Sequence, residues 1–585
     1  MTTMLTLHDP RTAREHYLSG VWQHDTLYTL LARHAEARPD AIAVRDPQRS
    51  LTWRALQQEV DATAAALHRA GVQTGERVAI WLSNRVECVV IFLACSRNGY
   101  ICCPSLHQNY TVGEVVTLLK RIRCAALFTE PGYGADAAQH AILDRLADIP
   151  TLRQVYALPR PGAAHAVQAS DAPAASQAPS GAQATQDMDA WAVMPAGPSV
   201  AAEARAVDTN ADKIVYLAFT SGTTGDPKGV MHSDNTLLAN GRALVTDWRH
   251  DHATVLLTLS PLSHHIGTVA LEQMLVAGMT LVVHAPAAGV SALDVILQSG
   301  ATYVMGVPTH AMDILDAVRQ RQLAQLGAVR CFYMAGSAIP QEVAERFVAL
   351  GVTPQNVYGM TENGSHQYTL PDDPGATIVG TCGRACTGYE IRIWDAEHPD
   401  IEVPAGEIGE IGGRGGVLML GYYDDQIATE SSFNRHGWFM SGDLGRLDEN
   451  GCLQILARKK DLIIRGGHNI HPSRIEDLAH RHAGVARAAA FAVADARLGE
   501  KVCLALIARS DAQLDADAVL AHLAEQGLSR FDMPEYFLVM PAFPLTASGK
   551  ILKRELRAWV DSGRIHPQAV RYVATARTEL KGMAT

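Results

Sequence analysis

Short apolar runs alternate with longer stretches of helical periodicity along most of this sequence, and that alternation limits the folds it can adopt. Residues 55–70 have the pattern of an amphipathic helix, 77–82 that of a strand, and 86–95 that of a buried helix. The alternation resumes at residue 214 and continues to about residue 350. Because strands separated by helices usually pair in parallel, the sequence predicts an α/β protein whose helices cover a parallel sheet.

The length and the changing texture of the chain predict more than one domain. With 585 residues, the chain exceeds the size at which one hydrophobic core keeps growing. Beyond residue 395 the sequence becomes rich in glycine and short strands, which indicates a distorted β-subdomain. We therefore expect a large N-terminal domain of layered α/β subdomains over 1–459, a small α+β domain over 460–557, and a tail over 558–585.

One stretch does not fit the α/β pattern. Residues of about 159–212 are rich in Ala, Pro, Ser, Gln and Gly, with almost no large aliphatic side chains. Such a segment cannot bury enough apolar surface to order itself, so it predicts a mobile surface insertion. A regulatory or docking role remains an alternative.

Composition and charge exclude several classes of partner. The formal net charge of −11 gives no support to binding of nucleic acid or anionic membranes. The N-terminus has no signal-peptide pattern, and the apolar run 88–95 is too short for a membrane span. The ten cysteines lack metal-site spacing. These features favour a cytoplasmic protein, and they leave its oligomeric state open.

The most informative segment is Thr-Ser-Gly-Thr-Thr-Gly-Asp-Pro-Lys-Gly at 220–229, directly after a predicted strand. Its glycines let the backbone approach a bulky anion, and its hydroxyls and lysine supply donors for polyphosphate oxygens. It is not a Walker A loop, because no G-K-[ST] closes the spacing. The residues expected to hold a polyphosphate are Thr220, Ser221, Gly222, Thr223, Thr224, Gly225 and Lys228.

This loop resembles the phosphate-binding loop of the adenylate-forming superfamily, which includes acyl-CoA synthetases. Further stretches match the family's motifs in order: YGMTE at 358–362, SGD at 441–443, ARKKDLII at 457–464 and PLTASGK at 544–550. Two positions depart from the pattern, Ser441 for Thr and Ala457 for Gly. The resemblance covers about 30–557 without the insertion, and it implies an enzyme that adenylates a carboxylic acid with ATP and passes the acyl group to a thiol.

The resemblance assigns roles around the nucleotide. Thr361 contacts the α-phosphate, Glu362 helps hold Mg²⁺, and Lys550 bridges the attacking carboxylate and the α-phosphate. Asp443 accepts hydrogen bonds from the ribose hydroxyls, and Arg458 reaches the ribose or the phosphates. Three more positions are expected at the nucleotide: Gly336, Ser337 and Tyr358.

The resemblance also implies a moving C-terminal domain. Lys460 is the expected hinge, and the loop with Gly466 and Gly467 is expected to line the entry tunnel of the thiol. The favoured thiol is coenzyme A, because no fused carrier module follows Lys550. Loading of a separate carrier protein is the alternative, and a nucleotide-binding regulator without catalysis is a further one.

The acid itself is expected to bind beside the segment Pro-Leu-Ser-His-His-Ile-Gly at 261–267. By resemblance to acyl and aryl acid ligases, His264 lies at the pocket mouth and shapes entry of the acid. The apolar or small residues expected to line the pocket are Ile266, Met305, Gly306, Gly336, Val357 and Gly359. A pocket of this kind favours a hydrophobic acid, whether alicyclic, aromatic or of medium chain length.

Overall fold

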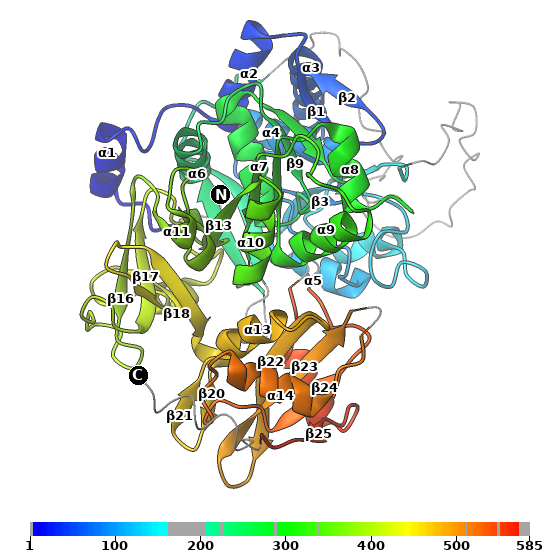
Figure 1. Cartoon of the computed structure of the whole chain (residues 1–585). Coiled ribbons are helices and arrows are strands. Elements are labelled where there is room, and N and C mark those ends of the chain that lie inside the picture. Colours follow the sequence, from blue (N-terminus) through cyan, green and yellow to red (C-terminus); the bar gives the residue numbers. More distant parts are fainter. Residues whose placement is uncertain are drawn as a thin grey trace, which may run out of the picture.

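The computed structural model describes residues 4–161, 205–220, 227–285, 289–336, 339–509, 512–546 and 550–572. Figure 1 shows a large N-terminal domain and a smaller C-terminal domain below it, as the sequence predicts. The expected insertion at about 159–212 lies mostly outside the described residues. Where the chain becomes described again it rejoins the N-terminal domain, since the Asp208 amide donates to the Arg97 carbonyl at 2.8 Å.

Two sheets form the framework of the N-terminal domain. The first has the order β6-β5-β3-β4-β7-β8, and all its pairs are parallel except the hairpin β7–β8. Its strands are β3 Arg77–Trp81, β4 Ile101–Cys103, β5 Cys124–Thr129, β6 Gln154–Ala157, β7 Ile214–Thr220 and β8 Lys228–Ser233. The parallel α/β arrangement predicted from the alternating sequence is therefore present.

The second sheet has nine strands in the order β15-β14-β13-β12-β11-β9-β10-β1-β2. The central pairs from β13 to β1 are parallel, and β2, β14 and β15 are antiparallel additions at the edges. Its strands are β1 Ile42–Arg45, β2 Ser50–Thr52, β9 Val255–Thr258, β10 Thr280–Val283, β11 Tyr303–Gly306, β12 Cys331–Met334, β13 Thr353–Met360, β14 Gly364–Tyr368 and β15 Arg384–Ala385.

Helices fill the space between these sheets and cover their outer faces. α4 Val86–Asn98, α6 Asp234–Asp247 and α7 His265–Ala277 contact strands of the framework and share one buried core with both sheets. Helices that are apolar around most of their circumference belong in such an interior. The outer helices are α2 Leu27–Ala37, α3 Trp53–Arg69, α5 Val112–Arg121, α8 Ala292–Ser299, α9 Pro308–Gln320 and α10 Gln341–Ala349.

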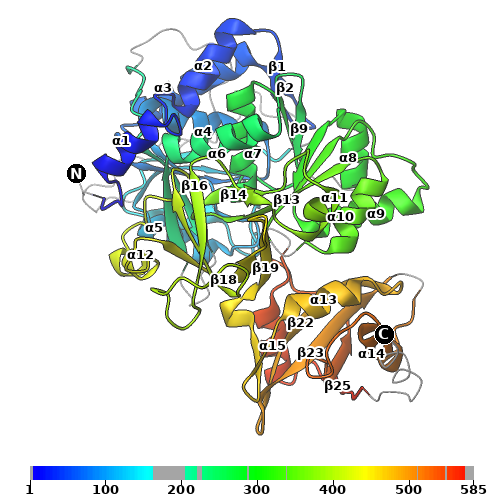
Figure 2. The ribbon, with the colours of Figure 1, turned by 60° about the vertical axis from the view of Figure 1, so that its left-hand side comes forward.

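The glycine-rich region beyond residue 395 forms the expected distorted β-subdomain. Its antiparallel sheet has the order β16-β17-β18-β19, and the register shifts in both β17–β18 and β18–β19. The strands are β16 Tyr389–Trp394, β17 Gly409–Gly415, β18 Phe439–Leu447 and β19 Leu453–Arg458. This sheet leads directly into the C-terminal domain (Figure 2).

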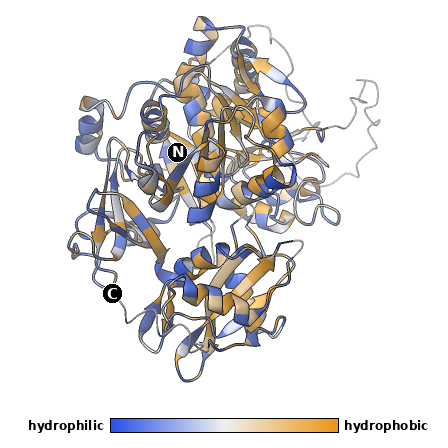
Figure 3. Cartoon of the chain, in the orientation of Figure 1, coloured by the Kyte–Doolittle hydropathy of each residue, from blue (hydrophilic) through white to orange (hydrophobic). Residues whose placement is uncertain are grey.

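The C-terminal domain is a mixed sheet with three helices. Its strands are β20 Ile463–Arg465, β21 His468–Ile470, β22 Val485–Asp495, β23 Gly499–Ala508, β24 Tyr536–Val539 and β25 Gln568–Ala569. Its helices are α13 Pro472–His480, α14 Ala516–Glu525 and α15 Lys553–Asp561. In Figure 3 the helices of this domain carry both hydrophilic (blue) and hydrophobic (orange) residues, as expected where one face of a helix is buried.

The ordered part of this domain continues past residue 557, where the sequence predicted a tail to begin. Trp559 and Val560 extend the apolar face of α15 against a buried cluster, and β25 pairs with β24. Burial of that face explains why the chain does not leave the domain at the expected position. Among the helices of the described residues, none combines the length and apolar character that a membrane span requires.

Candidate active site

The segment expected to bind polyphosphate connects β7 to β8. Thr220 and Lys228 are register partners where the hairpin opens. The Lys228 Nζ lies 4.7 Å from the centre of the Tyr422 ring. Five of the expected polyphosphate residues, Ser221, Gly222, Thr223, Thr224 and Gly225, lie outside the described residues.

Tyr422 also holds the carboxylate expected to bind a metal. Its hydroxyl donates to Glu362 Oε1 at 3.0 Å, so one side chain positions both Lys228 and Glu362. Burial raises the pKa of Glu362, while the tyrosine hydroxyl and the Arg458 charge oppose that shift. A bound cation would offset this penalty on the charged form. Nothing in the sequence singled out Tyr422.

Among the described residues, one carboxylate is available to bind Mg²⁺. In the parts of the chain that the structure describes, no group of three or more His, Cys, Asp or Glu side chains is placed to hold a metal ion. Mg²⁺ usually binds through one or two carboxylates together with substrate phosphates and water. Glu362 alone therefore fits a metal that arrives with ATP.

The turn after β13 carries Thr361 and is held from beneath by a buried histidine. The His232 Nε2 lies 2.7 Å from the Thr361 carbonyl oxygen, and its Nδ1 lies 3.0 Å from Thr236 Oγ1. Burial lowers the pKa of His232 to about 4, so the ring is neutral near pH 7. A neutral ring donates from only one nitrogen, and donation to the carbonyl requires the proton on Nε2. No sequence motif assigned this supporting role to His232.

Asp443 is held by two partners from different strands. The Tyr358 hydroxyl donates to Oδ2 at 3.0 Å, and Arg458 Nε lies 3.1 Å from Oδ1. Asp443 and Arg458 are direct cross-strand partners in β18 and β19. Burial raises the pKa of Asp443, and the Arg458 charge opposes it. The two partners leave a carboxyl that, in its ionised form, accepts hydrogen bonds from a pair of hydroxyls.

Lys550 comes from the C-terminal domain and reaches the N-terminal domain. Its Cε lies only 3.1 Å from the place a Cβ would occupy on Gly336, whose φ is +97°. The glycine therefore leaves room for the lysine as well as allowing a backbone conformation that other residues avoid. Burial, and then repulsion from Arg458, lower the pKa of Lys550 to about 8. Ser337, the expected neighbour of Gly336, lies outside the described residues.

Attractive charges in the same place act on Lys550 in the opposite direction. Asp443 and Glu362 each raise its pKa, although less than burial lowers it. The lysine therefore lies within electrostatic reach of both carboxylates expected at the nucleotide. One site therefore brings together three residues that are far apart in the sequence: Glu362, Asp443 and Lys550.

His264 begins α7 beside this lysine. The half-buried ring caps the helix, with Nδ1 3.5 Å from the Ile266 amide. Burial, followed by the positive charge of Lys550, lowers the pKa of His264 well below its ordinary value. A neutral histidine next to a cationic lysine is compatible with an entry route for a carboxylate.

The expected acid-binding residues divide into two groups. Ile266, Met305 and Val357 are buried together in the core between α7 and the second sheet. Two of the three expected glycines, Gly306 and Gly359, are closely packed instead: a Cβ on Gly306 would lie 3.2 Å from a ring nitrogen of His310, and one on Gly359 would overlap a carbonyl oxygen at 1.8 Å. Gly359 is therefore required by the turn itself.

The expected thiol-tunnel loop is not brought to this site. Gly466 and Gly467 form the turn between β20 and β21, with φ of +58° and +85°. The Gly466 amide donates to the Leu498 carbonyl within the C-terminal domain. Figure 1 shows β21 on the side of that domain away from the N-terminal domain. Lys460, the expected hinge, lies in the short helix Lys459–Asp461 between the two domains.

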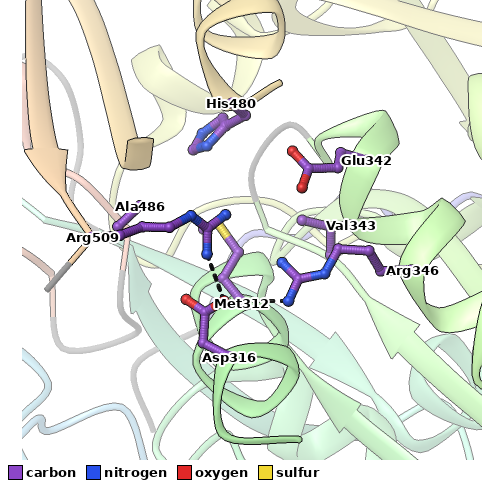
Figure 4. Close-up of a pocket in the computed structure, with 8 residues that line it drawn as sticks. All are labelled: Met312, Asp316, Glu342, Val343, Arg346, His480, Ala486 and Arg509. Atoms are coloured by element: carbon purple, nitrogen blue, oxygen red, sulfur yellow. Dashed lines mark hydrogen bonds and ion pairs between the residues drawn. The ribbon is translucent and has the colours of Figure 1, made fainter. Parts of the chain in front are cut away.

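Ion pairs fix the C-terminal domain in this position (Figure 4). Asp316 of α9 binds Arg509 at 2.6 Å and Arg346 of α10 at 3.2 Å. Asp313 of α9 binds Arg487 of β22 at 2.6 Å. The contacts surround a small cleft lined by Met312, Asp316, Glu342, Val343, Arg346, His480, Ala486 and Arg509.

Comparisons with known proteins match nearly the whole chain to the family that its motifs resemble. Residues 31–423 match the family model of AMP-binding enzymes, and residues 474–550 match that of the AMP-binding enzyme C-terminal domain. A medium-chain fatty-acid–CoA ligase of Escherichia coli is 30% identical over 95% of this chain and 94% of its own. A 3-[(3aS,4S,7aS)-7a-methyl-1,5-dioxo-octahydro-1H-inden-4-yl]propanoyl:CoA ligase of Mycobacterium tuberculosis is 32% identical over 91% and 98%.

Solved structures share the fold. ATP-bound MatB from Rhodopseudomonas palustris has a TM-score of 0.75 and 26% identity, and the match covers 92% of this chain and 100% of that one. The anthranilate CoA ligase AuaEII in complex with anthranoyl-AMP has a TM-score of 0.79 at 22% identity, over 93% and 98%. The chain therefore belongs to the AMP-binding enzyme family of the adenylate-forming superfamily and is an AMP-forming acid–thiol ligase.

Proposed function

We propose that this ligase adenylates a hydrophobic carboxylic acid of the medium-chain, alicyclic or aromatic type and transfers the acyl group to coenzyme A. The observation that carries the proposal is the position of Lys550, which lies against Gly336 and within electrostatic reach of Glu362 and Asp443. The buried apolar group of Ile266, Met305 and Val357 suits an apolar acid. The names of the relatives, which include ligases of medium-chain and ring-containing acids, agree with this class.

In the first step, a carboxylate oxygen of the acid attacks the α-phosphorus of ATP. A carbon–oxygen–phosphorus linkage forms, the bond from the α-phosphorus to the bridging oxygen breaks, and pyrophosphate leaves. Lys550 orients the carboxylate and the α-phosphate and balances their negative charge. Asp443 accepts from the ribose, Thr361 contacts the α-phosphate, and Lys228 with the 220–229 loop holds the outgoing phosphates.

Glu362 is the residue that would hold Mg²⁺, and the ion supplies neutralisation of phosphate charge when bound. Tyr422 keeps the Glu362 carboxylate aimed into the site through its 3.0 Å hydrogen bond. His264, neutral in this environment, shapes the entry of the acid without adding a competing charge.

In the second step, the thiol sulfur attacks the acyl carbon, a carbon–sulfur bond forms, and the bond from the acyl carbon to the phosphate oxygen breaks. AMP leaves, and the thiol proton is released to solvent. Lys550 lies against Gly336 in the present arrangement, whereas β21, which follows the turn at 466–467, lies on the side of the C-terminal domain away from the N-terminal domain. We infer a rotation of the C-terminal domain about Lys460 between the two steps. The rotation withdraws Lys550 and brings the glycine turn to the thiol tunnel.

The test is pyrophosphate release from ATP and Mg²⁺ across a panel of carboxylic acids, each with and without coenzyme A. Lys550→Ala serves as the inactive control, because it should abolish adenylation and retain ATP binding. Formation of AMP and an acyl-CoA that requires both acid and coenzyme A supports the proposal. An adenylate that coenzyme A fails to discharge would favour a carrier protein as acceptor, and silence across the panel would refute the proposed activity.

A further inference from the structure

A buried carboxyl group in α7 has no role in the chemistry described so far. The side chain of Glu272 is 1% exposed, and neither carboxyl oxygen has a hydrogen-bond partner among the described residues. α6 packs directly against its base, where a Cβ on Gly241 would lie 2.8 Å from the Glu272 Cβ. Buried polar groups are nearly always satisfied, so an unsatisfied one requires an explanation.

The position of Glu272 along α7 connects it to the acid site. His265, Val269 and Glu272 follow one another at helical spacings of four and three, so they share one face of the helix. Glu272 lies eight residues beyond His264, which corresponds to about 12 Å along the helix axis. An acid whose carboxylate lies beside His264 and Lys550 would point its far end along this face.

Other buried groups of the same region are polar and paired with each other. The Tyr333 hydroxyl lies 2.6 Å from Ser365 Oγ, and the Tyr216 hydroxyl lies 3.3 Å from His265 Nδ1. The Glu272 carboxyl raises the pKa of both tyrosines, which places it near the two hydroxyls without bonding to either. The three groups thus surround a polar end of an otherwise apolar region.

The strand that carries Tyr333 also leads to the reaction centre. Tyr333 lies in β12, three residues before Gly336, against which Lys550 is packed. α7 contacts β9, β10, β11 and β14 of the second sheet. Val269, Met305 and Val357 belong to the buried core of the same region. Apolar side chains therefore predominate in this part of the core, and Glu272 is a buried carboxyl within it.

We propose that Glu272 forms the far end of the acid pocket and hydrogen-bonds an oxygen-bearing group, a hydroxyl or a ketone, on the distal part of the acid. This inference rests on the proposed function, and it narrows the substrate class to a largely apolar acid with one distal oxygen. Burial raises the pKa of Glu272 well above its ordinary value. In its protonated form the carboxyl donates to a ketone or hydroxyl oxygen and accepts from a hydroxyl. An unsubstituted acid would leave the carboxyl unpaired.

The test compares acids that differ only in the distal oxygen. Decanoate is paired with ω-hydroxydecanoate, and cyclohexylpropanoate with its ring-ketone and ring-hydroxyl forms. The readout is kcat/KM for acyl-CoA formation by the full chain, expressed as the ratio of oxygenated to parent acid. The variants are Glu272→Leu, which removes the polar group, and Glu272→Gln, which keeps the size and one donor. Glu59→Gln, at a part-buried carboxylate paired with Arg49, is the control.

The wild-type chain and the control should prefer at least one oxygenated acid by about tenfold or more, as one net hydrogen bond of about 1.4 kcal/mol predicts. Glu272→Leu should remove that preference, chiefly through better use of the parent acid, and Glu272→Gln should retain part of it. Turnover of parent acids with the same ratio in all variants would overturn the role of Glu272 and leave the proposed function intact. No turnover of any acid would overturn both. If Glu272→Leu fails to fold, Glu272→Gln provides the test. The inference is contradicted if the ratio of kcat/KM for oxygenated and parent acids is the same in Glu272→Gln as in the wild-type chain. It is also contradicted if the wild-type chain shows no preference for an oxygenated acid.

Discussion

The protonation of Lys550 predicts the pH dependence of adenylation. In the proposed mechanism Lys550 acts in the first step through its positive charge, and burial together with Arg458 lowers its pKa to about 8. The amine is charged below this pKa, so activity should be lost as the pH rises through it. At one pH unit above the pKa about one lysine in ten is charged, so kcat/KM should fall about tenfold per unit there.

The assay is pyrophosphate release without coenzyme A, measured as kcat/KM from about pH 6 to pH 10, because this quantity reports the free enzyme. Lys550→Arg keeps a positive charge throughout that range, so its profile should lose the decline near pH 8 even though its overall rate is lower. Lys459→Arg, at a lysine paired with Glu410, is the matched control and should retain the decline. A wild-type profile with no decline up to about pH 10, or an identical decline in Lys550→Arg, would refute the reasoning.

Three further predictions concern the nucleotide, the domain interface and the turn after β13. Asp443→Asn should raise the Kd for ATP by about 10- to 100-fold by calorimetry, because hydrogen bonds to an ionised acceptor contribute about 1.5–3 kcal/mol; unchanged affinity would contradict its ribose role. Arg509→Met breaks the part-exposed pair with Asp316, so single-turnover adenylation should slow by only about two- to fivefold. In that variant, thioester formation from supplied acyl-adenylate should not slow. Gly359→Ala should destabilise the chain by about 1–3 kcal/mol in thermal unfolding, because its Cβ would overlap a backbone carbonyl, whereas Gly375→Ala, with no neighbour within 4 Å, should not.

Much of the framework was readable from local pattern. The strand expected over 77–82 is β3 Arg77–Trp81, and the helix expected over 55–70 is α3 Trp53–Arg69. The sequence predicts a tail from residue 558, whereas in the structure α15 and β25 extend the C-terminal domain past residue 557. α15 contains many charged residues, so its apolar face is not evident from the sequence. The burial of that face depends on strands that are distant in the chain.

The candidate active site likewise combines residues that the sequence predicted with residues that it did not. The motifs named Glu362, Asp443 and Lys550 by resemblance, whereas Tyr422 and His232, which hold two of the motif segments in place, have no sequence signal of their own. Their contacts join residues 60 and 129 positions apart in the chain. Local spacing carries no information about pairs so far apart.

By itself, the sequence determined the α/β framework, the family and the residue types available for phosphate, ribose and acid. Periodicity records which face of each element is buried, and the motifs record which backbone and side-chain groups approach a ligand. Only the tertiary structure decided that Lys550 lies against Gly336, that the glycine turn at 466–467 lies elsewhere, and that Glu272 is buried without a partner. Burial, pKa shifts and domain position depend on everything packed around a group, and that environment exists only once the chain has folded.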